Sequence, residues 1–124
     1  MSSLRLVLVD DHALVRAGLR ALLGEMAGVS VVAEAGDGRE ALQLIREHKP
    51  DIALLDISLP AGNGFTVAER MKTALPNPVP VIFLTASKQP GFRDRARELG
   101  AAGYFEKPYE AEDLLAAVRQ RIGA

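Results

Sequence analysis

The stretch Ile52-Ala53-Leu54-Leu55-Asp56-Ile57-Ser58-Leu59-Pro60 decides how the rest of the chain is interpreted. An apolar run of strand length ends in a single carboxylate, Asp56, and residues 60–64, rich in proline and glycine, then favour a loop. Continuous apolar runs are typical of strands buried in a parallel sheet, and ligands bind beyond the carboxyl ends of such strands. Asp56 is therefore the first candidate for a reactive residue.

Length and composition describe a single globular domain. The 124 residues are 48% hydrophobic and 25% charged, with a formal net charge of -1 from 15 basic and 16 acidic residues. This balance gives no sign of a surface that binds nucleic acid or membrane. The sequence has no cysteine, which excludes disulfides and thiolate metal ligands. The first apolar run reaches Asp10 too soon for a signal peptide or a membrane span, so we expect a soluble, cytoplasmic protein.

Strand-like and helix-like segments alternate five times along the chain. Apolar runs predict strands at residues 6–9, 29–35, 52–55, 79–84 and 101–105. Apolar residues at helical spacing predict helices that include residues 15–26, 41–45, 67–75, 92–99 and 111–122. The fourth helix should start near Pro90 and dock loosely, because its apolar stripe is thin. The alternation predicts a single α/β domain over residues 1–124: a doubly wound, flavodoxin-like (βα)5 fold, with a five-stranded parallel sheet in the order 2-1-3-4-5 and helices on both faces.

Polar residues fall at the strand-to-helix loops of this predicted fold: Asp10, Asp11, Asp56, Thr85 and Lys107. These loops open on one edge of a parallel sheet, so the side chains should converge on a small area. Clustered carboxylates repel one another, and a divalent cation relieves that repulsion. Oxygen ligands without nitrogen or sulfur favour Mg2+. The sequence therefore predicts a magnesium site at this edge of the sheet.

The same cluster has the groups that phosphoryl transfer to a carboxylate requires. Asp56 would be the nucleophile and would form an acyl phosphate. Lys107 supplies a positive charge for the phosphoryl group, Thr85 supplies a hydroxyl donor, and the small Ala86 beside it leaves space. A carboxylate is already ionised when it reacts, so this chemistry needs no general base.

These residues, taken in order, resemble the receiver domain of bacterial two-component response regulators. The resemblance rests on Asp10-Asp11, Asp56, Thr85-Ala86 and Lys107-Pro108 and extends over essentially the whole chain. The stretch Val9-Asp10-Asp11-His12-Ala13-Leu14-Val15-Arg16-Ala17-Gly18-Leu19 is similar to receivers that precede LuxR-type helix-turn-helix domains. The family implies a signalling protein that catalyses its own Mg2+-dependent phosphorylation and dephosphorylation, rather than an enzyme with a separate substrate.

The resemblance implies a role for each residue of the magnesium site. Asp56 is expected to accept phosphate from a phosphohistidine on a sensor histidine kinase or a histidine phosphotransfer protein. Asp11, Asp56 and the backbone carbonyl of Ser58 are expected to bind Mg2+ directly, and Asp10 through water. Lys107 is expected to pair with the phosphate.

The resemblance also implies how the signal leaves the site. Thr85 matches the switch hydroxyl, and Tyr104, three residues before Lys107, matches the switch aromatic. The face formed by the fourth helix, the fifth strand and the fifth helix would contact an output domain or a second copy of the chain. The domain itself is expected to bind neither nucleic acid nor membrane. Many receivers have an amide or acidic side chain where this chain has Ser58 and Ser87, which bears on the lifetime of the phosphorylated state.

Other functions stay open at this point. A phosphatase of the haloacid dehalogenase type also has an aspartyl nucleophile, but it carries a second Asp two residues later, where this chain has Ser58. A flavodoxin-type binding module would have a phosphate loop rich in Ser, Thr and Gly in place of Asp10-Asp11-His12. A receiver that switches by protein contact alone would not need the phosphorylation residues. We interpret His12 as a helix-start residue and Tyr109 as an exposed contact.

Overall fold

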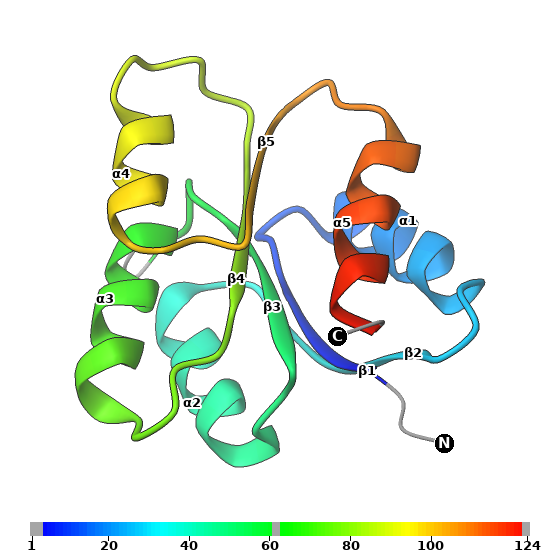
Figure 1. Cartoon of the computed structure of the whole chain (residues 1–124), viewed down its shortest axis with the longest axis horizontal. Helices are drawn as coiled ribbons and strands as arrows, with labels where there is room; N and C mark the ends of the chain where they lie inside the picture. The colour runs from blue at the N-terminus through cyan, green and yellow to red at the C-terminus, as the bar shows by residue number, and fades with distance from the viewer. Residues whose placement is uncertain (1–3, 61–62, 123–124) are drawn as a thin grey trace.

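The computed structural model describes residues 4–60 and 63–122, in which strands and helices alternate strictly (Figure 1). In chain order the elements are β1 (Leu4–Val9), α1 (Ala13–Gly24), β2 (Val29–Ala35), α2 (Gly38–His48), β3 (Ile52–Asp56), α3 (Gly64–Ala74), β4 (Val81–Thr85), α4 (Phe92–Glu98), β5 (Gly103–Glu106) and α5 (Ala111–Ile122). Neighbouring strands are parallel, in the order β2-β1-β3-β4-β5. None of the helices in these residues is both long and apolar enough to cross a membrane. The predicted flavodoxin-like α/β fold is confirmed.

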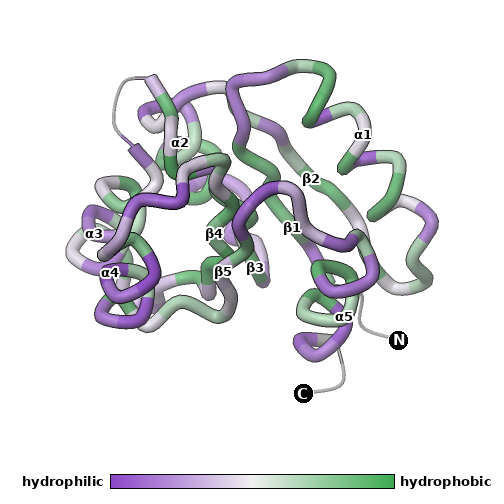
Figure 2. The backbone as a smooth tube through the Cα atoms, turned by 90° about the horizontal axis from the view of Figure 1, so that it is seen from above, coloured by the Kyte–Doolittle hydropathy of each residue, from purple (hydrophilic) through white to green (hydrophobic). Residues whose placement is uncertain are grey.

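Alternate side chains of the central strands pack on opposite faces of the sheet. Leu6 and Leu8 of β1 belong to the core under α1 and α5, whereas Val7 and Val9 belong to the core under α2, α3 and α4. Figure 1 shows the same division, with α1 and α5 on one side of the sheet and the other three helices on the opposite side. Because both faces are covered, β1, β3 and β4 are mostly apolar, and they form the largely green centre of Figure 2.

β4 begins at Val81, two residues later than the sequence predicted. Pro80 has no N–H and cannot complete a hydrogen-bond ladder with a neighbouring strand. Its carbonyl does accept a hydrogen bond from the Ala53 N–H at 3.0 Å, so the chain already runs beside β3 before the strand begins. The difference leaves Thr85 where the sequence placed it, at the carboxyl end of the strand.

β5 and α4 also begin two residues later than predicted. β5 begins at Gly103, because the Ala101 N–H donates to the Ala96 carbonyl at 3.0 Å and still completes the turn that follows α4. α4 begins at Phe92, after Gly91 adopts a φ of +97°. Glycine takes a positive φ without steric cost, so Gly91 separates the preceding loop from the helix.

α4 is short and lightly docked, as its thin apolar stripe predicted. Ala96 is the buried residue of this seven-residue helix. The Phe92 ring packs edge-on against Phe65 of α3, with ring centroids 5.3 Å apart, and Leu99 just beyond the helix is partly buried in the same core. These few apolar contacts attach α4 to the sheet.

The start of α3 lies very close to the end of β3. A Cβ atom at Gly64 would lie 2.7 Å from the backbone carbonyl oxygen of Asp56, which is closer than real Cβ contacts come. The Gly64 N–H donates to the Ile57 carbonyl at 2.9 Å across the same gap. A residue without Cβ is required for this approach, so Gly64 sets how α3 packs against the strand that carries Asp56.

Candidate functional site

Strand register brings the predicted carboxylates to one edge of the sheet. Val9 of β1 lies opposite Leu55 of β3, so the residues that follow them, Asp10 and Asp56, end the two strands side by side. Both side chains are buried, at 0% and 2% relative exposure, whereas the neighbouring Asp11 is exposed. The sheet therefore holds two carboxylates inside the molecule and leaves a third at its rim.

β4 and β5 bring the other predicted residues to the same edge. Asp56 lies opposite Leu84, and Thr85 lies opposite Glu106, so Lys107 is the first residue beyond β5. The Lys107 N–H donates to the Thr85 carbonyl at 2.7 Å, which joins the ends of the two strands. Asp10, Asp56, Thr85 and Lys107 thus come from four adjacent strands, as the sequence predicted.

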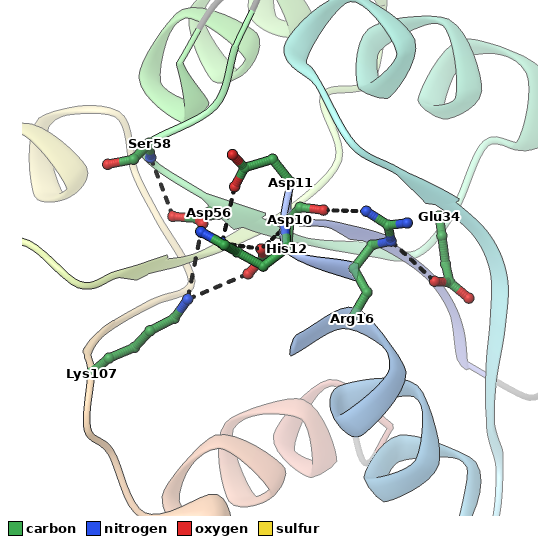
Figure 3. A network of polar contacts seen from close by, with 8 residues as sticks. All are labelled: Asp10, Asp11, His12, Arg16, Glu34, Asp56, Ser58 and Lys107. Carbon is green, nitrogen blue, oxygen red and sulfur yellow. Dashed lines mark hydrogen bonds and ion pairs between the residues drawn. The ribbon is translucent and has the colours of Figure 1, made fainter. Parts of the chain in front are cut away.

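The Lys107 ammonium group lies between the two buried carboxylates. Its Nζ is 3.3 Å from Asp10 Oδ2 and 3.9 Å from Asp56 Oδ2 (Figure 3). The lysine side chain is 24% exposed, so solvent screens these contacts less than it screens a surface ion pair. The site therefore contains a positive charge close to the candidate nucleophile.

Burial has the largest influence on the Asp56 carboxyl group. Loss of solvent raises its pKa above the ordinary 3.8, and the negative charges of Asp10 and Asp11 raise the pKa further. Lys107 and the Ser58 N–H, which donates to Oδ1 at 3.2 Å, favour the charged form but do not fully offset burial. A cation or a phosphoryl group bound here would interact with a carboxylate whose charge is incompletely neutralised.

The donor atoms at this edge fit a divalent cation. Carboxylate oxygens of Asp10, Asp11 and Asp56 and a ring nitrogen of His12 lie within 4.8 Å of one another. Mg2+ usually binds through one or two carboxylates and keeps water or phosphate oxygens as its other ligands. The residues present are therefore suited to the magnesium site that the sequence predicted.

His12 begins α1, as the sequence predicted, and also contacts the carboxylates. Its backbone N–H donates to Asp10 Oδ1 at 2.7 Å. Its Nδ1 lies 3.0 Å from the same oxygen and 3.1 Å from Asp11 Oδ1. His12 therefore bridges the buried and the exposed carboxylate. Its ring is 63% exposed, which places this contact at the rim of the site.

Ser58 and Ser87 contact the site through their backbone N–H groups. Ser58 N–H donates to Asp56 Oδ1, and Ser87 N–H donates to Thr85 Oγ1 at 3.0 Å. The Ser58 side chain points away from Asp56 (Figure 3). Thr85 is fully buried, and this hydrogen bond uses its oxygen as the acceptor, so the hydroxyl proton can be donated elsewhere. The Ser58 carbonyl as a metal ligand stays a prediction.

Tyr104 connects β5 to α4. It is partly buried against the core under α2, α3 and α4, and its hydroxyl is buried without a hydrogen-bond partner among the described residues. Arg93 of α4 lies over the ring, 4.7 Å from its centroid, and pairs with Glu106 at 3.6 Å. Burial raises the Tyr104 pKa, Glu106 raises it further, and Arg93 lowers it. This position suits a switch aromatic, and the switch role stays a prediction.

Tyr109 is not the exposed contact that the sequence suggested. It is partly buried, with its ring centroid 5.9 Å from that of Phe105, and it packs against the core under α1 and α5. Burial raises its pKa, and the negative charges of Asp10 and Asp56 raise it further. The phenol therefore lies near the edge of the sheet that carries Asp10, Asp11 and Asp56, which we call the acidic edge. No local signal reveals this, because the burial depends on how the loop after Lys107 returns to the sheet.

The fold and this acidic edge define an α/β domain whose candidate site lies at the carboxyl ends of parallel strands. The family model for the response regulator receiver domain matches residues 6–119. The chain therefore belongs to the response regulator receiver family.

Curated and solved relatives agree with this assignment. The transcriptional regulatory protein PdtaR of Mycobacterium tuberculosis is 38% identical over 118 residues, which are 95% of this chain and 56% of that protein. The signal receiver domain of the response regulator NarL from M. tuberculosis superposes with a TM-score of 0.90 at 35% identity, covering 100% of both chains. A two-component response regulator of the LuxR family from Aurantimonas sp. SI85-9A1 gives a TM-score of 0.89 at 35% identity, over 98% of this chain and 87% of that one. The chain spans about half the length of the curated relatives it matches.

Proposed function

We propose that this receiver domain takes a phosphoryl group onto Asp56 from a phosphohistidine of a sensor histidine kinase or a histidine phosphotransfer protein. The observation that carries the proposal is the position of Lys107 Nζ, 3.9 Å from Asp56 Oδ2 and 3.3 Å from Asp10 Oδ2. Phosphoryl transfer depends mostly on positioning and charge neutralisation, and this edge offers a carboxylate with a cation beside it. Membership of the response regulator family supports the same chemistry.

In the proposed reaction, an Asp56 carboxylate oxygen attacks the phosphorus atom of the phosphohistidine. A P–O bond forms as the P–N bond breaks, and the electron pair of the broken bond leaves with the imidazole nitrogen. Asp56 reacts in its charged form, so the site needs no base to activate it. The Ser58 N–H, 3.2 Å from Oδ1, holds the carboxylate in one orientation.

Mg2+ bound at this edge would neutralise charge on the phosphoryl oxygens. Asp11, Asp56 and the Ser58 carbonyl would hold it directly, and Asp10 would act through water. Lys107 would contact the phosphate from the side of β5, where a point charge suits its oxygens. The Asp10 carboxylate is fully buried, which favours this supporting role over direct exposure to the incoming group.

We propose that Thr85 and Tyr104 transmit the phosphorylation to α4. The Thr85 hydroxyl proton can be donated to a phosphoryl oxygen, and a hydrogen bond to a charged group is worth about 1.5–3 kcal/mol. Thr85 shares the end of β4 with the loop that leads to α4, and Tyr104 contacts Arg93 of that helix. The face formed by α4, β5 and α5 would then control an output domain or a second copy of the chain, in the cytoplasm.

Labelling with a small phosphodonor tests the phosphoacceptor. With Mg2+ and acetyl phosphate, the native chain should gain the mass of one phosphoryl group, and Asp56→Asn should gain none. Asp51→Asn is the matched control, because Asp51 is an exposed acid just before the opposite end of β3 and should not affect labelling. Equal labelling of Asp56→Asn in intact-mass spectra would contradict the assignment.

The same preparations test the switch and the alternative function. Beryllofluoride, which imitates an acyl phosphate, should change amide exchange in residues 86–99 of the native chain. Thr85→Ala should still bind it but show a reduced change. Steady turnover of p-nitrophenyl phosphate would instead favour the haloacid dehalogenase-type phosphatase, which the serine at position 58 makes the weaker alternative.

A further inference from the structure

Arg16 of α1 contacts the acidic edge from the side opposite Lys107. Its Nη1 donates to the backbone carbonyl of Asp10 at 2.6 Å. In Figure 3 the guanidinium group lies on the side of Asp10 that faces away from Asp56 and Lys107. The proposed phosphoryl transfer does not use Arg16.

Glu34 of β2 holds the Arg16 side chain in place. Arg16 Nε lies 3.4 Å from Glu34 Oε1, and Arg20 Nη1 lies 2.5 Å from Glu34 Oε2. The Arg16 and Glu34 side chains are 25% and 22% exposed, so their pairing is partly shielded from solvent. Arg16 Nε is itself buried and makes no hydrogen bond within the described residues, which leaves the Glu34 carboxylate to neutralise it.

The contact with the Asp10 carbonyl determines the direction of the chain that enters the metal site. A peptide unit is planar, so a donor bound to the carbonyl of Asp10 also orients the N–H and Cα of Asp11. The remaining polar groups of Asp10 are bound as well: its N–H donates to the Ala35 carbonyl at 3.1 Å, and its Oδ1 accepts from the His12 N–H. Arg16 therefore supplies the constraint on the side where the exposed Asp11 begins.

We propose that Arg16 is a positioning residue for the cation site: it orients the Asp10–Asp11 peptide, so that the Asp11 carboxylate lies in its binding position before Mg2+ arrives. The inference rests on the proposed function, because it concerns the same site. Arg16 touches neither the cation nor the phosphoryl group. Arg20 shares the Glu34 carboxylate and carries the same charge on the same helix, so a comparison of the two arginines separates an effect of Arg16 on geometry from an effect on the potential at the site.

Two neighbouring arginines allow a matched test. Arg16→Met and Arg20→Met each remove one positive charge from α1 and one partner of Glu34, but only Arg16 contacts Asp10. Titration of each protein with Mg2+ alone should show affinity roughly tenfold weaker in Arg16→Met, as is typical when a group that orients a metal ligand is lost. Arg20→Met should bind nearly as the native chain does. Equal affinity in the two variants would overturn the inference.

The rate of labelling by acetyl phosphate separates positioning from general damage. At saturating Mg2+, Arg16→Met should regain the native maximal rate, because its catalytic residues are unchanged and only the half-saturating Mg2+ concentration has increased. Arg16→Lys should lie between the native chain and Arg16→Met, since one ammonium group cannot bind the Asp10 carbonyl and Glu34 as a planar fork does. A lower maximal rate at an unchanged half-saturating concentration would show a merely structural role.

A metal-free measurement keeps this inference separate from the proposed function. Amide exchange at Asp11 and His12 should be faster in Arg16→Met than in Arg20→Met, because the loop has lost its support. If the native chain neither binds Mg2+ nor accepts phosphate, the proposed function fails, and this comparison still decides whether Arg16 holds the loop. Equal exchange in the two variants would contradict the inference.

Discussion

The acidic edge and the α4 side of the molecule are neighbours, yet different interactions hold them in place. At the acidic edge, Asp10 and Thr85 are fully buried, and the register of the central strands determines their positions. On the α4 side, Glu106 pairs with Arg93 at 3.6 Å and with Lys88 at 3.9 Å, and the two basic side chains are 58% and 70% exposed. Exposed pairs of this kind contribute little to stability because solvent and salt screen them.

The two regions should therefore differ in how easily they move. Moving a group at the acidic edge would disrupt sheet hydrogen bonds and a closed core, whereas α4 is attached through Ala96, Phe92 and a few exposed contacts. Regions with few buried contacts open at low free-energy cost. Under the proposed function, the acidic edge would hold the phosphoryl group in a fixed place and α4 would be the segment that responds to it.

The largest effect should come from Gly64→Ala, at the fixed end of the comparison. The new Cβ would lie 2.7 Å from the Asp56 carbonyl oxygen, and overpacking of this kind typically costs about 1–3 kcal/mol. Gly18→Ala is the matched control, because a Cβ on this exposed helical residue would have nothing within 4 Å. It should stabilise the protein by about 0.5–1 kcal/mol. Denaturant unfolding checks both, and a neutral Gly64→Ala would show that α3 is not held closely against β3.

The buried Asp56 carboxylate should make the metal-free protein less stable as the pH rises. Its folded pKa is raised above 3.8, chiefly by burial, so between the unfolded and folded pKa values the folded state binds more protons than the unfolded state. Stability therefore falls as the pH rises through that window, by about 1.4 kcal/mol for each unit of difference in pKa.

Asp56→Asn removes this cost and should be more stable than the native chain at neutral pH. Its advantage should shrink as the pH falls toward the ordinary pKa of 3.8, which denaturant unfolding at a series of pH values would follow. An advantage that stays constant over the whole series would mean that the charge of Asp56 is not responsible.

The smallest effect should come from Tyr104→Phe, on the α4 side. The Tyr104 hydroxyl is buried without a hydrogen-bond partner among the described residues, and leaving such a group unsatisfied costs about 1–3 kcal/mol. Its removal should stabilise the protein by about 1 kcal/mol, seen as a small rise in the unfolding temperature. Tyr109→Phe is the control. Tyr109 is also partly buried, but its hydroxyl is not among the buried side-chain atoms that lack a hydrogen-bond partner in the described residues. A loss of stability in Tyr104→Phe would show that its hydroxyl has a partner after all.

Local patterns in the sequence were sufficient for the architecture and for most of the acidic edge. Apolar runs of strand length and apolar stripes at helical spacing depend only on which side chains must be buried, so the sequence shows them directly. Five alternating strands and helices are then compatible with few topologies. Once the strands are parallel, their carboxyl ends share an edge, so Asp10, Asp56, Thr85 and Lys107 had to meet there. The predicted beginnings of β4, α4 and β5 were less accurate. A proline precedes β4, a glycine precedes α4, and the hydrogen bond that closes the turn after α4 delays β5.

Only the tertiary structure decided which polar groups support that edge. The sequence contains Arg16, Glu34 and Tyr109, but nothing near them in the chain indicates that Arg16 binds the Asp10 carbonyl or that Tyr109 is partly buried beside the site. Apolar periodicity is a local property that any helix or strand must satisfy in order to be buried. A hydrogen bond or ion pair between elements depends on register, on the rotation of a helix about its axis and on the path of a loop, and these are settled only when the whole chain packs.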